Sequence, residues 1–184
     1  GLVKGASRGE GLGNQFLANI REVDAIIHVL RCFENTDIVH VEGSIDPIRD
    51  AETVETELML ADLESLEKRM IGVQKKAQSC DKESKQLMTV MKPVLEMLQN
   101  GKPARLARPQ EPDLQRLFDN MYLLTGKPVL YACNVDEASA ATGNAYSQKV
   151  FEMARAQGNS AVVISAAIEA EVAQLTDPNE QKEF

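Results

Sequence analysis

The chain has 184 residues and a formal net charge of −8, with 43% hydrophobic and 26% charged residues. This composition is typical of a globular domain and excludes a disordered chain. No apolar run is long enough to span a bilayer, so we expect no membrane contact. Three widely spaced cysteines (Cys32, Cys80 and Cys133) and two distant histidines predict neither a disulfide framework nor a metal site, and favour a cytoplasmic protein.

The first fifty residues begin with a glycine-rich stretch and no initiator methionine, which suggests a piece of a longer protein. Residues 14–20 can begin a helix after this loop. Residues 25–30 form a short apolar run rich in β-branched side chains, which predicts a buried parallel strand. Residues 36–50 are loop-like.

Residues 51–110 have a different character, because apolar side chains recur every three or four residues. The first seam is Met59, Leu63, Leu66, Met70, Val73 and Ala77, and the second is Leu87, Met91, Val94 and Leu98. Such heptad spacing predicts an antiparallel coiled-coil hairpin of two helices, inserted into the surrounding domain. At about 1.5 Å per residue, the longer helix would extend on the order of 40 Å.

Half of the chain's basic residues lie between residue 68 and residue 108, on the hairpin and the segment that follows it. Residues 68–108 contain ten basic and three acidic residues, a local balance of +7 against −15 for the remainder. An element of this kind can contact a polyanion, although a solvated helical face is the alternative. The candidate contact residues are Lys68, Arg69, Lys75, Lys76, Lys82, Lys85, Arg105 and Arg108.

Residues 111–184 return to an alternating pattern. Apolar runs at 129–133 and 161–164 predict buried strands, and helices are expected near 111–121, 146–156 and 169–175. Strands that alternate with helices at both ends of the chain predict a parallel α/β sheet. We therefore divide the chain into 1–50, the insertion 51–110, and 111–184.

Two short motifs follow strands at the edge where parallel sheets bind ligands. One is Asn134-Val135-Asp136-Glu137, and the other is Ser165-Ala166. Their order and strand context resemble Asn-Lys-x-Asp and Ser-Ala, the base-recognition motifs of P-loop GTPases. The opening Gly1-Leu2 is similar to the end of the Asp-x-x-Gly motif.

The whole chain resembles the Obg-like ATPases of the YchF (EngD) type. The resemblance rests on the segment 1–17, on Arg31-Cys-Phe-Glu34, on the hairpin and on the motif 134–137. It implies a P-loop NTPase G domain with a coiled-coil insertion, a preference for ATP over GTP, Mg²⁺ dependence, association with the ribosome and a regulatory role in translation or stress. It also implies that the opening segment is switch II, with Leu2, Gly5, Gly9, Gly11 and Gly13, and that Gly1 lies at the nucleotide.

In this family the phosphate-binding loop and the Mg²⁺ ligands would precede Gly1, and a TGS domain would follow Phe184. We therefore expect a truncated G domain that does not hydrolyse ATP by itself. The strand at 25–30 would lose its neighbour, so we expect self-association through this edge. The alternative function is a ribosome- or RNA-binding hairpin module without nucleotide chemistry.

The motif at 134–137 bears on base preference. In Asn-Lys-x-Asp the aspartate accepts from guanine N1–H and the 2-amino group, whereas adenine has no 2-amino group. Glu137 is one methylene longer, which disfavours that guanine pair, and Asn134 can still bond the purine N7 and 6-position edge. Val135 replaces the lysine whose stem would cover the ring. The alternative for Asn134 is a turn residue that bonds its own backbone.

A catalytic residue is needed because Leu2 occupies the position where Ras-like GTPases place a water-orienting glutamine. His28 lies within an apolar strand, which favours a core role. His40 lies in the loop that follows, where an imidazole could reach the γ-phosphate. An ordinary polar loop residue is the alternative.

Overall fold

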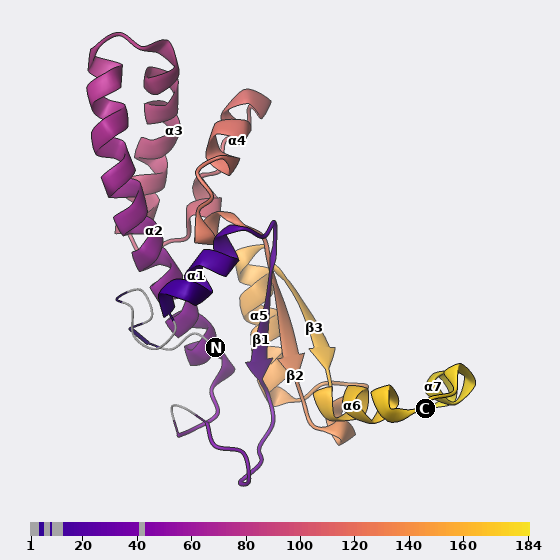
Figure 1. Cartoon of the computed structure of the whole chain (residues 1–184). Coiled ribbons are helices and arrows are strands. Elements are labelled where there is room, and N and C mark those ends of the chain that lie inside the picture. Colours follow the sequence, from indigo (N-terminus) through magenta and orange to yellow (C-terminus); the bar gives the residue numbers. More distant parts are fainter. Residues whose placement is uncertain (1–3, 6–7, 9–12, 41–42) are drawn as a thin grey trace. The chain divides into compact units, whose positions relative to one another are not determined.

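A computed structural model describes residues 4–5, 8, 13–40 and 43–184 (Figure 1). Its elements are α1 (Gly13–Arg21), β1 (Ile26–Arg31), α2 (Pro47–Gln78), α3 (Lys82–Gln99), η2 (Ala104–Ala107), α4 (Pro112–Asp119), η3 (Leu124–Gly126), β2 (Val129–Asn134), η4 (Glu137–Ser139), α5 (Ala145–Gln157), β3 (Ser160–Ile164), α6 (Ala166–Gln174) and α7 (Pro178–Glu183). The described residues group into two compact units. One comprises Glu52–Pro128 with the described part of Gly1–Ile26, and the other comprises Ile27–Ala51 and Val129–Phe184.

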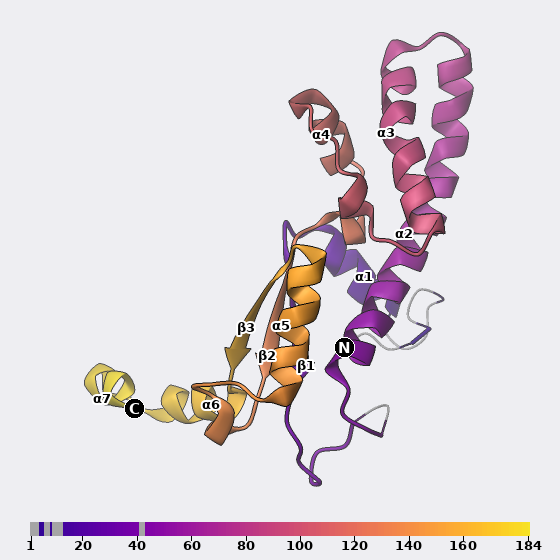
Figure 2. The ribbon, with the colours of Figure 1, turned by 180° about the vertical axis from the view of Figure 1, so that it is seen from behind.

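The predicted α/β fold is confirmed, because the described chain contains a three-stranded parallel sheet in the order β1-β2-β3. Strand β2 pairs with β3 in a register that sets Asn134 opposite Ile164. Helix α5 packs on β2 and β3 and covers one face of the sheet (Figure 2). Cys32 N donates to Asn134 O at 2.8 Å, so the end of β1 is held beside the end of β2.

Asn144 ties the sheet to α5. Its side chain accepts from the Ser147 backbone as the N-cap of α5, and its Nδ2 donates to Cys32 O at 2.6 Å. Gly143, just before this cap, has a φ of +73°, and a Cβ there would approach Ser147 Oγ to 2.6 Å. Glycine therefore fits this close turn. The cap holds the residue that follows β1 beside the start of α5.

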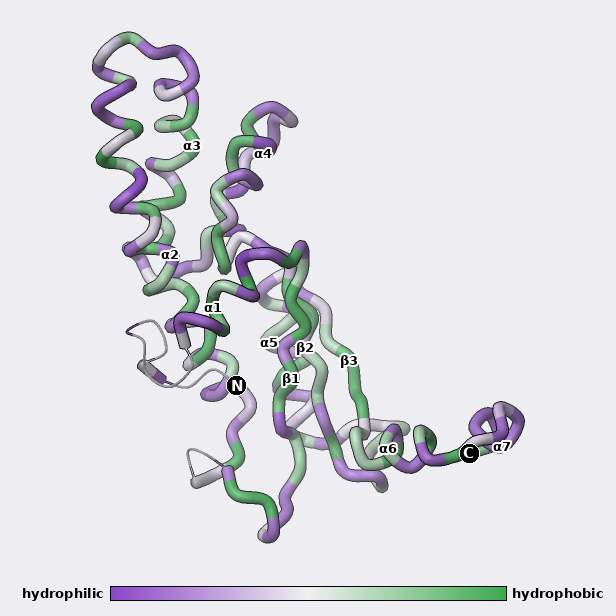
Figure 3. Tube along the Cα trace, in the orientation of Figure 1, coloured by the Kyte–Doolittle hydropathy of each residue, from purple (hydrophilic) through white to green (hydrophobic). Residues whose placement is uncertain are grey.

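Helices α2 and α3 form the antiparallel hairpin that the two apolar seams predict, and we call this pair the arm. Hydrophobic and hydrophilic residues alternate along both helices (Figure 3). Asp81 caps α3 by accepting from Ser84 N, and Cys80 in the connecting turn has a φ of +67°. At about 1.5 Å per residue, the 32 residues of α2 span roughly 48 Å.

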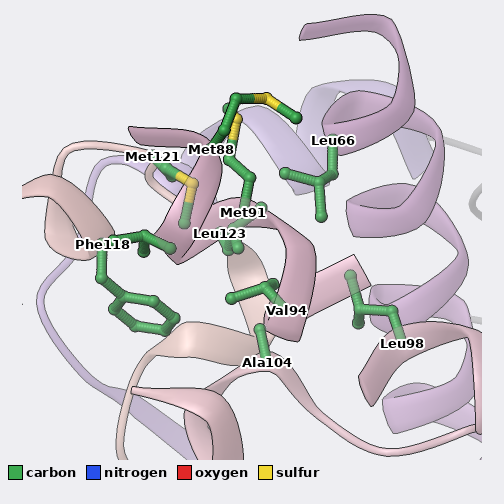
Figure 4. Close-up of a cluster of buried hydrophobic side chains, with 10 residues drawn as sticks. Leu66, Met88, Met91, Val94, Leu98, Ala104, Phe118, Met121 and Leu123 are labelled. Atoms are coloured by element: carbon green, nitrogen blue, oxygen red, sulfur yellow. The ribbon is translucent and has the colours of Figure 1, made fainter. Parts of the chain in front are cut away.

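The arm shares its core with the segment that follows it (Figure 4). Leu66 of α2 and Met91 and Val94 of α3 are buried in one cluster with Phe118 of α4 and Leu123. This packing explains how a two-helix element acquires a closed core, because η2 and α4 cover the side that a free coiled coil would expose.

A buried carboxylate joins the arm to the chain after α4. Asp62 has no exposed surface and accepts from Leu124 N at 2.8 Å, from Thr125 N at 2.8 Å and from Thr125 Oγ at 2.6 Å. Burial raises the pKa of the Asp62 carboxyl above its ordinary value, although these three donors act in the opposite direction. Thr125 Oγ in turn accepts from Ala104 N at 2.9 Å, so one network holds α2, η2 and η3 together.

Candidate functional site

The two sequence motifs meet at the carboxyl edge of the sheet. Asn134 is the last residue of β2, and Ser165-Ala166 follows the last residue of β3. Asn134 Oδ1 accepts from Ala166 N at 2.9 Å, and Val135 N donates to Ile164 O at 2.9 Å. The parallel register of β2 and β3 produces this contact, because it sets their final residues side by side. We call these two loops the rim.

The orientation of Asn134 has a chemical consequence. Because its Oδ1 is occupied by an N–H donor, its amide Nδ2 is the group that remains to donate to a ligand. The Ala166 N–H is the donor in this hydrogen bond. The rim therefore offers an amide donor at Asn134 but does not offer the Ala166 N–H.

The rest of the first motif divides into buried and exposed residues. Val135 is 2% exposed, so its side chain lies in the protein interior. Asp136 and Glu137 are exposed where η4 begins. The exposed Glu137 carboxylate can therefore contact a ligand at the rim. The Val135 side chain is buried and is not available to contact the face of a bound base.

Ser165 is buried at the start of α6. Its carbonyl oxygen accepts from Glu169 N at 3.0 Å. Its Oγ has no hydrogen-bond partner among the residues that the structure describes. A buried hydroxyl without a partner is costly, and it can satisfy itself by donating to or accepting from a bound polar ligand.

His40 lies in the segment between β1 and α2, as predicted from its place in the loop. Its Nε2 lies 2.7 Å from Asp50 Oδ2, in the first turn of α2. His28 instead lies on β1, with its ring 5.8 Å from that of Tyr131. Burial lowers the pKa of His28, and the charge of Asp50 acts in the opposite direction.

The predicted switch residues are only partly described. Gly1, Leu2, Gly9 and Gly11 lie outside the described residues. Gly5 has a φ of +89°, and its N–H donates to Glu57 Oε1 of α2 at 2.8 Å. Gly13 is the first residue of α1 and is buried.

The basic candidates of the arm differ in accessibility. Those exposed to solvent are Lys68, Arg69, Lys75, Lys76, Lys82, Lys85 and Arg108. Of these, Lys68 pairs with Glu64 at 2.7 Å, Arg69 donates to Asn120 O at 3.4 Å and Arg108 pairs with Asp119 at 3.1 Å.

Arg105 differs from the other basic candidates. Its side chain is 12% exposed, and its Nη2 lies 2.9 Å from Glu55 Oε1 of α2. Arg105 therefore fastens η2 to the arm and offers little surface to a partner.

Sequence reasoning missed Asp50 and Asn144. Both are common polar residues in helix-start contexts, and spacing carries no signal that they bond His40 and Cys32. In the described part of the chain, no three His, Cys, Asp or Glu side chains are grouped as metal ligands. Nor does any described helix have the length and apolarity needed to cross a membrane.

The three-stranded parallel sheet and the helices that accompany it define part of a P-loop NTPase G domain. The chain is 49% identical over 184 residues to the ribosome-binding ATPase YchF of Haemophilus influenzae and 44% identical over 183 residues to that of Bacillus subtilis. It covers 50% of each of these relatives. The solved structure of the Schizosaccharomyces pombe YchF GTPase is also similar, with a TM-score of 0.80 and 33% sequence identity. The match covers 98% of the present chain and 50% of the chain in that structure.

The chain belongs to the YchF family. It spans about half the length of the curated relatives that it matches. No protein-family model matches it.

Proposed function

We propose that this chain is the base-recognition and arm segment of a ribosome-associated ATPase of the cytoplasm. The proposed nucleotide binding is supported by the hydrogen bond from Ala166 N to Asn134 Oδ1, because it joins two motifs from separate strands into one rim. Asn134, Asp136, Glu137, Ser165 and Ala166 are proposed to line the purine, with Val135 contributing backbone only. Gly1 is proposed to lie at the phosphates, and Mg²⁺ acts in the intact protein through ligands outside this chain.

We propose that the rim prefers ATP to GTP for two reasons. The Ala166 N–H is already bonded, so it is not available to donate to the 6-oxo group of guanine. Glu137 is one methylene longer than the aspartate that pairs with guanine N1–H and the 2-amino group. Adenine needs neither the Ala166 N–H nor a carboxylate at the aspartate position, and its N7 can accept from Asn134 Nδ2.

The test is a comparison of ATP and GTP affinities in the full-length protein. Glu137→Asp shortens the carboxylate and should raise GTP affinity relative to ATP by about tenfold, the worth of one hydrogen bond to a charged group. Asn134→Ala should weaken both nucleotides. Glu152→Asp makes the same change at an exposed position of α5 and should leave the ratio unaltered. An unchanged ratio in Glu137→Asp contradicts the proposed base discrimination.

We propose His40 as the residue that takes the proton of the attacking water, in place of the glutamine that Leu2 replaces. His40→Ala in the full-length protein should lower turnover by about 10²–10⁴-fold while leaving ATP affinity intact. The 184-residue chain by itself is proposed to be inactive, because its sequence contains no G-x-x-x-x-G-K-[ST] loop to hold the phosphates. Turnover by the purified chain would contradict this.

A second proposal concerns the arm, as a module that contacts ribosomal RNA. The supporting observation is the exposure of Lys75, Lys76, Lys82 and Lys85 around the turn between α2 and α3. Lysines that neutralise phosphates release counterions, so this contact should weaken steeply with salt. Retention on ribosomes that is insensitive to salt would contradict it.

A further inference from the structure

His40 is held by a carboxylate of the next helix. Its Nε2 and Asp50 Oδ2 are 2.7 Å apart, and the two side chains are 14% and 19% exposed. Asp50 belongs to the first turn of α2, where its N–H donates to Asp46 O at 3.0 Å. The imidazole therefore bonds to an element of regular structure, although His40 itself lies in a loop.

The chemistry of the pair determines the tautomer of the ring. An ionised carboxylate can only accept hydrogen bonds, so His40 Nε2 must be the donor. In the neutral imidazole this places the hydrogen on Nε2 and the basic lone pair on Nδ1.

Asp50 is in turn fixed by its neighbour. Arg49 Nη2 lies 3.3 Å from Asp50 Oδ1, on the carboxylate oxygen that does not face His40. The same guanidinium donates to Ser44 O at 2.7 Å and to Ser44 Oγ at 2.8 Å. Gly43 N donates to His40 O at 3.0 Å. These bonds tie Gly43 to His40, and Ser44 to the first turn of α2.

We propose that Asp50 is the positioning residue of His40, which holds the imidazole in place with Nδ1 as the proton acceptor. The inference rests on the proposed function of His40. In the step that it serves, a water proton passes to Nδ1 while the water oxygen bonds to the γ-phosphorus. The bond from phosphorus to the β–γ bridging oxygen breaks, and its electron pair leaves on ADP. Asp50 does not touch the reacting atoms.

The kinetic test compares Asp50→Asn with a matched control in the full-length protein. Asp50→Asn should lower kcat by about 10–100-fold, the range known for carboxylates that orient metal-binding histidines, with KM for ATP within about twofold. Asp50→Glu retains an acceptor and should recover part of the rate. Asp37→Asn removes the same charge from an exposed position of the same loop and should leave kcat unaltered. Thermal unfolding of each variant verifies that it is folded. A wild-type kcat in Asp50→Asn overturns the proposal, as does a matching loss in Asp37→Asn.

A spectroscopic test is independent of turnover. The chain has only two histidines, so long-range ¹H–¹⁵N spectra at about pH 8.5 contain two ring systems, and His28→Phe identifies that of His40. The Nε2–H tautomer should predominate at His40 in the wild type and decline in Asp50→Asn. Predominance of the Nδ1–H tautomer in the wild type overturns the proposal.

The two assays separate this inference from the function on which it rests. If His40→Ala retains full turnover, the catalytic role of His40 fails whatever the spectra show. If His40→Ala is slow but Asp50→Asn is not, only the role of Asp50 fails.

Discussion

Asp62 is the buried carboxylate that joins α2 to η3, and its replacement by alanine should strongly destabilise the unit that contains the arm. The change leaves three donors without an acceptor, namely the N–H groups of Leu124 and Thr125 and the Thr125 hydroxyl. Leu124 and Thr125 are both buried, so water does not readily replace the carboxylate.

The size of the effect follows from these contacts. A buried polar group left without a partner costs about 1–3 kcal/mol. Three such groups, with partial relaxation, give a loss of about 3–5 kcal/mol, within the range measured when one partner of a buried charged network is removed. This is a large fraction of the roughly 5–15 kcal/mol by which a domain is stable.

Urea unfolding followed by circular dichroism measures this loss as a lower midpoint. Asp62→Asn preserves the size of the side chain and one acceptor oxygen, but it turns an amide donor toward the Thr125 donors, so we expect about 2–3 kcal/mol. Glu67→Ala removes an exposed carboxylate from the same helix and should change stability by less than about 0.5 kcal/mol. If Asp62→Ala unfolds at the same midpoint as Glu67→Ala, the buried network does not stabilise the arm.

Three other predictions concern pH, association and the arm. The pKa of His28 is lowered by burial, so the unfolded chain binds this proton more readily and stability falls as the pH drops below about 6.5. His28→Phe should therefore lose less stability than the wild type between pH 8 and pH 5 in urea titrations, and equal losses would count against burial of the neutral ring. In the described sheet β1 is an edge strand, and its Ile27 and Val29 side chains are 66% and 58% exposed. We therefore expect the chain to self-associate at high concentration, and Ile27→Lys to lower the average particle mass measured by light scattering. A monodisperse wild-type monomer would rule this out. Replacing Lys75, Lys76, Lys82 and Lys85 with alanine should weaken ribosome binding and flatten its salt dependence in pelleting assays, whereas Lys149→Ala with Arg155→Ala on α5 should do neither.

The sequence predicted the local structure well, because helix and strand periodicity are properties of neighbouring residues. The apolar seams predicted the arm, and the run at 129–133 predicted β2, which ends one residue later at Asn134. The strand predicted at 25–30 is β1, shifted by one residue. The division of the chain at residues 50 and 110 stays a prediction.

The placement of the motifs could also be expected, since the carboxyl ends of parallel strands share one edge. That expectation did not extend to individual atoms. The bond that occupies both Asn134 Oδ1 and Ala166 N depends on the register between β2 and β3, and the burial of Val135 depends on what packs beneath the rim. Neither is encoded in the motif itself.

The order of residues along the chain was enough to predict the kind of fold, the arm and the residue types at the rim. The folded chain adds that Arg105 is paired with Glu55 while Lys75 and Lys82 face solvent, and that His40 contacts Asp50. These pairings could not be predicted because a charge or a ring has no fixed partner until packing brings distant segments together. Burial then makes an unpaired polar group too costly to leave alone.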